Sequence, residues 1–143
     1  ILKALQRDGR LSQLELADEI GLSPTPCARR VKKLEAEGYI RGYTALIDEE
    51  MLGFGFSIFV SVRLDKQVDE RLVTFEESVA RYQEVVDCWL MTGGFDYLLR
   101  IAVSDLHEFE RFLTQKLTKI EGVASIESSI PLRRVKESVA RLM

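Results

Sequence analysis

The stretch from Ser23 to Leu34 constrains this chain more than any other. It begins with the residues of a helix start, and it contains four basic residues and no acidic one. It reads SPTPCARRVKKL. Ser23 can act as the N-cap, and Pro24 suits the first helical position, where a backbone N–H has no partner within the helix. Val31 and Leu34 share one side of this helix, and the polar side is purely cationic. Such a helix favours an anionic groove, and DNA is the usual one.

The residues before this helix predict the first half of a helix-turn-helix. Ser12 and Glu15 have the spacing of a capping box, so a helix is expected to begin there. Gly21 supplies the tight turn, since a positive φ is cheap only for glycine. We expect the inner face of this first helix to carry Leu14, Ala17 and Ile20, with Leu16 nearby.

The helix that follows is expected to run to about Glu37, with Gly38 ending it. A plain helical hairpin with a solvated basic face is the alternative, but the pattern A-x-x-x-G-L-S from Ala17 to Ser23 favours the DNA-binding motif. Residues 39–48 are rich in β-forming side chains. They are either a small wing that brings Arg41 near phosphates or a linker strand with a solvated Arg41. The chain begins with Ile1, partway into a predicted helix, so we expect N-terminal residues to be missing.

The distribution of charge separates this part from the rest of the chain. The net charge is −3, which alone argues against a DNA-binding protein. Residues 1–47 carry 8 basic and 6 acidic side chains, which gives +2, whereas residues 48–143 carry 12 and 17, which gives −5. We therefore predict a DNA-binding domain at 1–47, a linker at 48–55 and a domain of a different kind at 56–143.

The second domain shows the order β-α-β-β-α-β. The expected strands are 56–65, 85–92, 97–103 and 123–130, and the expected helices are 69–82 and 105–120. This order predicts an α+β fold, a ferredoxin-like antiparallel sheet that follows an N-terminal winged helix-turn-helix. The inner face of the second helix is expected to carry Leu106, Phe109, Phe112, Leu113 and Leu117. Residues 132–143 fit either a further strand or a helical turn.

Both helices of such a fold cover the same face of the sheet, so the opposite face needs another cover. The side chains on one face of the strand, either Phe56, Ile58 and Val60 or the residues that alternate with them, cannot all remain exposed to solvent. A second copy of the chain is the economical cover. The resulting homodimer would present two DNA-binding heads to half-sites about 34 Å apart, or a multiple of that distance.

The sequence argues against several other classes of protein. Cys27 and Cys88 are far apart and His107 is the only histidine, so we expect no metal site and a reducing, cytoplasmic environment. No apolar run approaches the roughly 20 residues of a membrane span, and no signal peptide is visible. We expect no catalytic residues, because the chain has no asparagine and its histidine has no evident partner. A ferredoxin-like hydrolase of the acylphosphatase type is kept as a weaker alternative.

Two sets of motifs, in this order, resemble one known family. The N-terminal motif is EIGLSPTPCARRVKKLEAEGYI, and the later ones are DEEMLGF, TGGFDYLLRI and KLTKIEGVASIESSI. Together they resemble the Lrp/AsnC family of leucine-responsive and asparagine regulators, also called feast/famine regulators. The resemblance covers essentially the whole chain, although the first helix is shorter than is usual in the family.

This resemblance implies a prokaryotic transcriptional regulator without a cofactor, whose effector is a small amino acid. Leucine, methionine and asparagine-like amino acids are the candidates. The C-terminal domain would form homodimers that assemble further, often to octamers, with the amino acid between subunits. In the family the ligand site is formed by the loop that matches Gly93, Gly94, Phe95, Asp96 and Tyr97, completed across a subunit interface by residues that match Ser128 and Ser129.

The chemistry of these residues is compatible with a zwitterionic ligand. Gly93 and Gly94 let backbone N–H groups approach a carboxylate closely. Asp96 can accept a hydrogen bond from an ammonium group, or it can fix the loop. Ser128 and Ser129 offer small hydroxyls. From the residues alone an ordinary hairpin turn is the favoured explanation of this loop, and only the resemblance favours a ligand.

We predict that the DNA contacts come from six residues. Thr25, Arg29 and Arg30 are the candidates for contacts at or near the bases, and Ser23, Lys32 and Lys33 for contacts to phosphates. A protein of the same fold that organises double-stranded DNA without any ligand is the main alternative. The operator, and whether the protein activates or represses, do not follow from the sequence.

Overall fold

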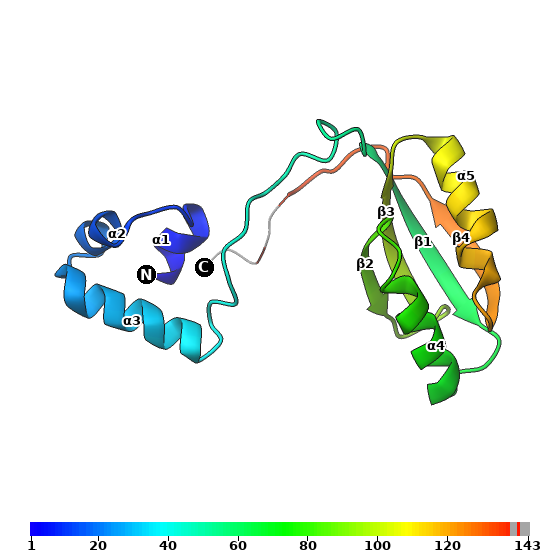
Figure 1. Ribbon diagram of the computed structural model, residues 1–143, viewed down its shortest axis with the longest axis horizontal. Helices are drawn as coiled ribbons and strands as arrows, with labels where there is room; N and C mark the ends of the chain where they lie inside the picture. Colours follow the sequence, from blue (N-terminus) through cyan, green and yellow to red (C-terminus); the bar gives the residue numbers. More distant parts are fainter. Residues whose placement is uncertain (138–139, 141–143) are drawn as a thin grey trace. The chain divides into compact units, whose positions relative to one another are not determined.

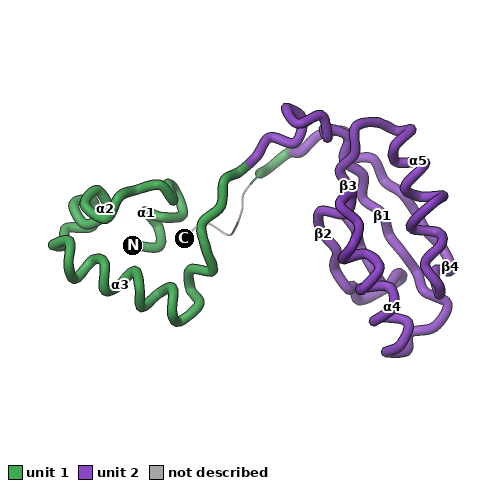
Figure 2. The backbone as a smooth tube through the Cα atoms, viewed as in Figure 1, with its two compact units in different colours: residues 1–46, 135–143 green, residues 47–134 purple. Residues whose placement is uncertain are grey.

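The computed structural model describes residues 1–137 and 140, and the chain divides into two compact units. The first comprises Ile1–Leu46 with a part of the tail that begins at Val135, and the second comprises Ile47–Arg134 (Figure 2). The segment predicted as a linker, 48–55, lies in the second unit. Residues 132–137 form neither a strand nor a helix, and the rest of that open prediction, at 138–139 and 141–143, lies outside the described residues.

The first unit contains three helices (Figure 1): α1 Leu2–Arg7, α2 Gln13–Glu19 and α3 Pro24–Ala36. Its small core consists of Ala4, Leu16, Ala17 and Cys27, with partly buried neighbours that include Val31. The side chain of Cys27 is completely buried, so the first turn of α3 is anchored directly to α1 and α2. The small size of Ala4 and Ala17 lets the helices approach closely.

The signals for the start and the turn of this motif are confirmed. The Glu15 amide donates to Ser12 Oγ at 3.2 Å and the Ser12 amide donates to Glu15 Oε2 at 2.8 Å, so the capping box is complete. Gly21 has φ 66° and Gly38, just after α3, has φ 78°. Ser23 occupies the N-cap position of α3, but its side chain makes no capping hydrogen bond.

The predicted inner face of α2 is wrong at one residue. Leu14 is 68% exposed, whereas Leu16 is only 2% exposed. With about 3.6 residues per turn, a face centred on Leu16, Ala17 and Ile20 leaves Leu14 outside it. The helix therefore sits rotated from the predicted orientation, and it is Leu16 that enters the core.

Residues 39–48, all of which the structure describes, contain no strand. Their start is held on α3, since the Ile40 amide donates to the Leu34 carbonyl at 3.2 Å and the Tyr43 hydroxyl to Glu35 Oε1 at 3.2 Å. A strand needs a neighbour for its backbone groups, and nothing in residues 39–48 pairs in a ladder. The β-rich composition is thus not realised as a strand within one subunit.

The second unit has the predicted ferredoxin-like order. Its elements are β1 Phe56–Leu64, α4 Asp69–Val79, β2 Val85–Leu90, β3 Tyr97–Val103, α5 Leu106–Gln115, the short 3-10 helix Leu117–Lys119, and β4 Val123–Ser129. The strands pair antiparallel in the order β2-β3-β1-β4. Figure 1 shows α4 and α5 on one side of this sheet. The α+β fold class is therefore confirmed.

Alternate residues of the central strands form the core beneath the two helices. Ile58, Val60 and Val62 are fully buried and lie opposite Ile101, Leu99 and Tyr97 of β3. They pack with aromatic side chains of the helices: Phe75 stacks on Tyr97 with ring centroids 4.5 Å apart, and Phe112 meets Tyr82 edge-on at 5.7 Å.

The predicted inner face of α5 needs one correction. Leu106 is 59% exposed, whereas Phe109 and Phe112 are buried. The Asp105 carboxylate caps the helix by accepting from the Glu108 amide at 2.8 Å, and Glu108 accepts from the Ser104 amide at 2.6 Å rather than from Asp105. Leu106 is consequently the first helical residue, ahead of the turn that meets the sheet.

Among the described residues, no helix or strand covers the opposite face of the sheet (Figure 1). This face carries the alternates of the buried residues, which are Ser57, Phe59, Ser61 and Arg63 of β1 and Leu98, Arg100 and Ala102 of β3. These side chains are partly exposed, apart from Arg63, which is exposed, and Trp89 of β2 is 45% exposed beside them. The face is therefore a mixture of aromatic, small and charged residues.

Among the residues that the structure describes, no helix is both long enough and apolar enough to cross a membrane.

Candidate functional site

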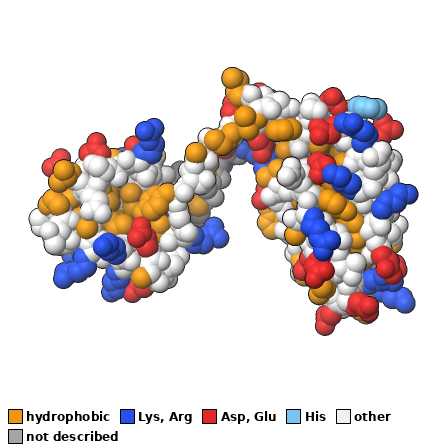
Figure 3. All heavy atoms as spheres, viewed as in Figure 1, with side chains coloured by type: hydrophobic (Ala, Val, Ile, Leu, Met, Phe, Trp, Pro, Cys, Tyr) orange, Lys and Arg blue, Asp and Glu red, His pale blue; other side chains and the backbone are white. Residues whose placement is uncertain are grey.

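The first candidate site is the outer face of α3. All six residues predicted to contact DNA are exposed, and Figure 3 shows basic side chains gathered along this helix. Lys33 Nζ lies 3.7 Å from Glu37 Oε1, but both side chains are well exposed, so this pair is weak. Arg29, Arg30 and Lys32 form no ion pair with any described residue. The cationic charge of this face is therefore largely unneutralised.

A shallow hollow runs along this face. It is lined by Gln13, Pro24, Thr25, Ala28, Arg29 and Lys32. Thr25, Arg29 and Lys32 are spaced i, i+4 and i+7, so they share one side of the helix, whereas Arg30 does not line the hollow. Gln13 was missed by the sequence reasoning. The signal was available, because Ser12 is the N-cap of α2, which makes Gln13 the first residue of that helix.

The second candidate site is the hairpin loop between β2 and β3. Gly93 has φ 109°, which favours glycine at this position. The Met91 amide donates to the Asp96 carbonyl at 2.8 Å, and the Asp96 amide donates to the Val62 carbonyl at 2.8 Å. The loop is thus closed on itself and attached to the end of β1.

The Asp96 side chain is turned into the protein. It is only 4% exposed, and its Oδ2 accepts from the Leu64 amide at 2.7 Å while Oδ1 accepts from Gln67 Nε2 at 2.5 Å. Both oxygens are therefore used within the subunit. Of the two roles considered for Asp96, this geometry is that of fixing the loop.

Arg63 holds the same loop from the open face of the sheet. Its guanidinium donates to the Gly94 carbonyl, and it forms no ion pair with a described acid. Gln67 and Arg63 were both missed by the sequence reasoning. They lie about thirty positions before the loop, and only the pairing of β1 with β3 brings them to it.

Tyr97 faces the helices rather than solvent. It is 1% exposed, and its hydroxyl donates to Glu76 Oε1 at 2.7 Å. Burial, followed by the hydrogen bond to Glu76, raises the pKa of the Tyr97 hydroxyl well above its usual range. Its side chain therefore belongs to the core, and only its backbone lies at the loop. Phe95 is half-buried.

One subunit does not bring Ser128 and Ser129 to this loop. They are exposed on the edge strand β4, opposite Val60 and Phe59, whereas the loop meets β1 at Val62 and Leu64. Strands β3 and β1 also separate β4 from β2. In the described part of the chain no cluster of three or more His, Cys, Asp or Glu residues could hold a metal ion.

Comparison with known families identifies the two parts of the chain that carry these candidate sites. Residues 1–41 match the winged helix-turn-helix DNA-binding family, and residues 57–140 match the Lrp/AsnC ligand-binding domain. This chain belongs to the Lrp/AsnC family. It is therefore a DNA-binding transcriptional regulator, with α3 in its DNA-binding part and the β2–β3 loop in its ligand-binding domain.

Individual relatives extend over almost the whole chain. The Bkd operon transcriptional regulator of Pseudomonas aeruginosa is 50% identical over 135 residues, which cover 94% of this chain and 88% of that protein. The leucine-responsive regulatory protein of Escherichia coli is 38% identical over 138 residues, which cover 96% and 84%. A transcriptional regulator from Neisseria meningitidis, solved as a complex with L-methionine, is 36% identical with a TM-score of 0.92 and covers 96% of this chain and 89% of that one.

A further solved structure carries the same ligand. The feast or famine regulatory protein from M. tuberculosis, complexed with L-methionine, is 28% identical with a TM-score of 0.84, over 99% of this chain and 94% of that one.

Proposed function

We propose that this Lrp/AsnC regulator contacts DNA through the outer face of α3 and that a small amino acid at the β2–β3 loop changes its assembly or its affinity for DNA. The observation that carries the proposal is the unneutralised cationic face of α3. A helix with exposed arginines and lysines along one side attracts the phosphates of the duplex and can present its remaining side chains to the major groove.

The hollow on α3 refines which residues meet the bases. Thr25, Arg29 and Lys32 lie together along it with Gln13, so we assign them to the centre of the DNA contact. Arg30 and Lys33 lie to one side, where contacts to phosphates are the natural role. Ser23, at the start of α3, also suits a phosphate.

The ligand part of the proposal rests on the loop that contains Gly93, Gly94 and Asp96. Two related structures hold L-methionine, so methionine is the first candidate for this chain, followed by leucine and asparagine-like amino acids. The loop's backbone N–H groups would bind the ligand carboxylate. Asp96 would act by fixing the loop, because both of its oxygens already accept hydrogen bonds from Leu64 and Gln67.

Assembly forms the third part of the proposal. The open face of the sheet, with Phe59, Leu98 and Trp89, would be covered by a second copy of the chain. Further assembly to an octamer would bring Ser128 and Ser129 of another subunit to the loop, which one subunit does not do. We include no enzymatic activity in the proposal. A DNA-organising protein without a ligand is the competing function.

A thermal-shift screen against the twenty amino acids, followed by duplex titrations with any amino acid that binds, tests the ligand part. We expect at least one amino acid to raise the melting temperature of the wild type and to change its affinity for DNA. A flat response to all twenty, with unchanged DNA affinity, would contradict the sensor function and favour the ligand-independent alternative.

A further inference from the structure

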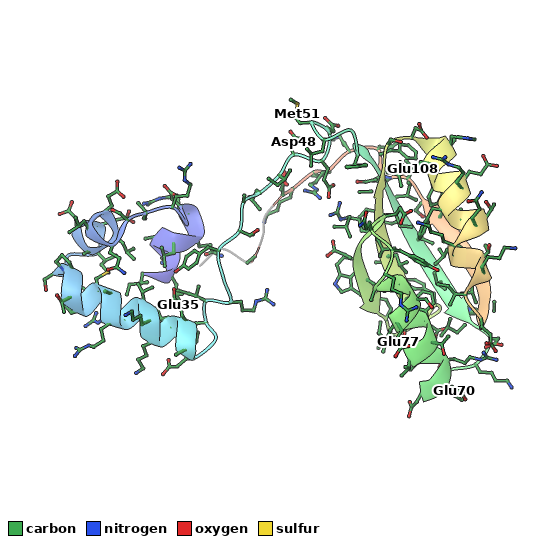
Figure 4. The ribbon with its side chains drawn as sticks, in the orientation of Figure 1. Glu35, Asp48, Met51, Glu70, Glu77 and Glu108 are labelled. Atoms are coloured by element: carbon green, nitrogen blue, oxygen red, sulfur yellow. The ribbon has the colours of Figure 1, made fainter. Side chains whose placement is uncertain are left out.

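The segment just before β1 is a hydrogen-bonded turn rather than a loose connection. Asp48 Oδ1 accepts from the amides of Glu50 at 2.9 Å and Met51 at 3.2 Å. The Phe54 amide then donates to the Glu49 carbonyl at 2.8 Å. Figure 4 labels Asp48 and Met51 in this turn. We call residues 48–54 the entry turn, because the chain enters the second unit through it.

Hydrophobic packing does not hold the entry turn in place. Met51 is 83% exposed, Leu52 is 61% exposed and Phe54 is 45% exposed. The apolar core of the second unit begins at Phe56 and includes none of these residues. The entry turn therefore needs some other attachment to the sheet.

Arg100 provides this attachment. It lies in β3 on the open face of the sheet, and its side chain is only 13% exposed. Nη1 donates to Glu49 Oε2 at 2.9 Å and Nη2 to Glu49 Oε1 at 3.1 Å, while Nε donates to Asp87 Oδ2 at 3.1 Å. The guanidinium is therefore shared between the entry turn and β2. We call this group of three residues the Arg100 clamp.

The clamp is bidentate and more buried than the exposed ion pairs found among the described residues. A bidentate pair between a guanidinium and a carboxylate is strong and fixes direction, which a single exposed contact does not do. The pair between Lys33 and Glu37 is an example of the weaker kind. The hydrogen bonds from Arg100 lower the pKa of the Glu49 carboxyl group, as expected for a carboxylate held in its charged form.

We propose that Arg100 is a positioning residue for DNA binding: its clamp on Glu49 fixes the point from which the chain runs back to the helix-turn-helix. Residues 39–46 connect α3 to this point. Breaking the clamp frees the entry turn, so each DNA-binding head searches a wider range of positions and loses more entropy when a dimer engages two half-sites.

The clamp also connects the entry turn to the hairpin of the ligand loop. Asp87 lies in β2 and Arg100 in β3, and these two strands carry that loop between them. A change in the pairing of β2 with β3 would shift Asp87 relative to Arg100. The Arg100 guanidinium, which also binds Glu49, would pass this shift on to the entry turn. This second step rests on the proposed amino-acid sensing, whereas the positioning role does not.

Hydrogen exchange and duplex titration of the full chain test the proposal. The variants are Glu49→Gln, Arg100→Met and the two combined, and the matched controls are Glu50→Gln in the same turn and Arg111→Met on α5. We expect faster exchange at the Gly53 and Phe54 amides in the clamp variants. DNA affinity should fall on the order of two- to thirty-fold, the range for residues that couple distant parts of a protein. The double variant should lose no more than Arg100→Met alone.

Four results would overturn the positioning role. The first three are unchanged exchange at Gly53 and Phe54, unchanged DNA affinity, and an equal loss of affinity in the controls. A fall in the oligomeric mass of the clamp variants, measured by light scattering, would also overturn it by assigning Arg100 to assembly. A separate measurement tests the proposed connection between the Arg100 clamp and the ligand loop. An amino acid that binds both wild type and Arg100→Met should change DNA affinity only in the wild type. If no amino acid binds either protein, the sensing function fails and the positioning result still stands.

Discussion

The two sites of this regulator are built in opposite ways. On α3 the polar groups point outward, and Arg29, Arg30 and Lys32 have no carboxylate partner among the described residues. At the β2–β3 loop the polar groups turn inward, and Asp96 and Tyr97 are buried with hydrogen-bond partners of their own chain. We propose that the first site acts through its side chains, whereas the second offers backbone groups whose position its side chains fix. Substitutions should therefore alter binding at α3 and stability at the loop.

The largest effect on binding alone is expected within α3. Arg29→Ala should weaken duplex binding by about 1–3 kcal/mol if this residue reads a base. Arg30→Ala should cost less and mainly reduce the salt dependence of binding, because Arg30 lies outside the hollow. The melting temperature should not change in either variant. Fluorescence anisotropy with duplex DNA and differential scanning fluorimetry measure the two quantities, and equal losses from both variants would remove the distinction between them.

At Asp96 we expect a substitution to lower the stability of the protein. Asp96→Ala leaves the buried Leu64 amide without an acceptor, which costs on the order of 1–3 kcal/mol of the free energy of unfolding. Any thermal shift caused by an amino acid should weaken as well. Asp96→Asn is the matched control, since its amide oxygen can still accept from Leu64. Chemical denaturation measures the loss, and an alanine variant as stable as the wild type would show that the loop does not depend on Asp96.

A smaller effect is expected from removing the Tyr97 hydroxyl, which we assign to the core and not to the ligand. Tyr97→Phe removes the hydroxyl that donates to Glu76 but keeps the ring stacked on Phe75. We expect a loss of about 1 kcal/mol in the free energy of unfolding and an unchanged response to amino acids. A calorimetric titration that showed weaker amino-acid binding in the variant would mean that the hydroxyl reaches the ligand.

The smallest effect is a dependence on pH at the Arg100 clamp. Arg100 lowers the pKa of Glu49 in the folded state, with a smaller contribution from Arg134, while the neighbouring Asp87 shares the guanidinium. The stability that this carboxylate contributes is therefore present above about pH 4.3, its ordinary pKa, and is lost as the pH falls through the lowered folded-state value. Glu49→Gln should remove this dependence. Hydrogen exchange of Phe54 between pH 3 and 6 measures it, and identical profiles for both proteins would contradict it.

The same contrast explains how much could be predicted from the sequence. Caps and turns act over a few residues, so Ser12, Glu15 and Gly21, together with the apolar periodicity and the cations of 23–34, were sufficient to predict the helix-turn-helix. Alternation along 56–64 was sufficient for β1. The rotation of α2, which buries Leu16 instead of Leu14, depends on where α1 and α3 pack.

The parts of the site that were missed depend on contacts between distant residues. Arg63 and Gln67 reach the ligand loop only because β1 pairs with β3, and Arg100 reaches Glu49 across 51 positions. Nothing near Gly93 in the sequence indicates these partners. The inward orientation of Tyr97 follows from the register that places it opposite Val62 on the helix-covered face.

The central claim is that the exposed cations of α3 form the DNA-binding surface. Its most direct test is the duplex affinity of the wild type and of the variant that combines Arg29→Ala with Arg30→Ala, measured over a range of salt concentrations. We predict weaker binding of the variant at every salt concentration. The slope of log K against log salt should also be smaller by about 0.9 for each phosphate that the variant no longer neutralises. The same affinity and the same slope for both proteins would contradict the account.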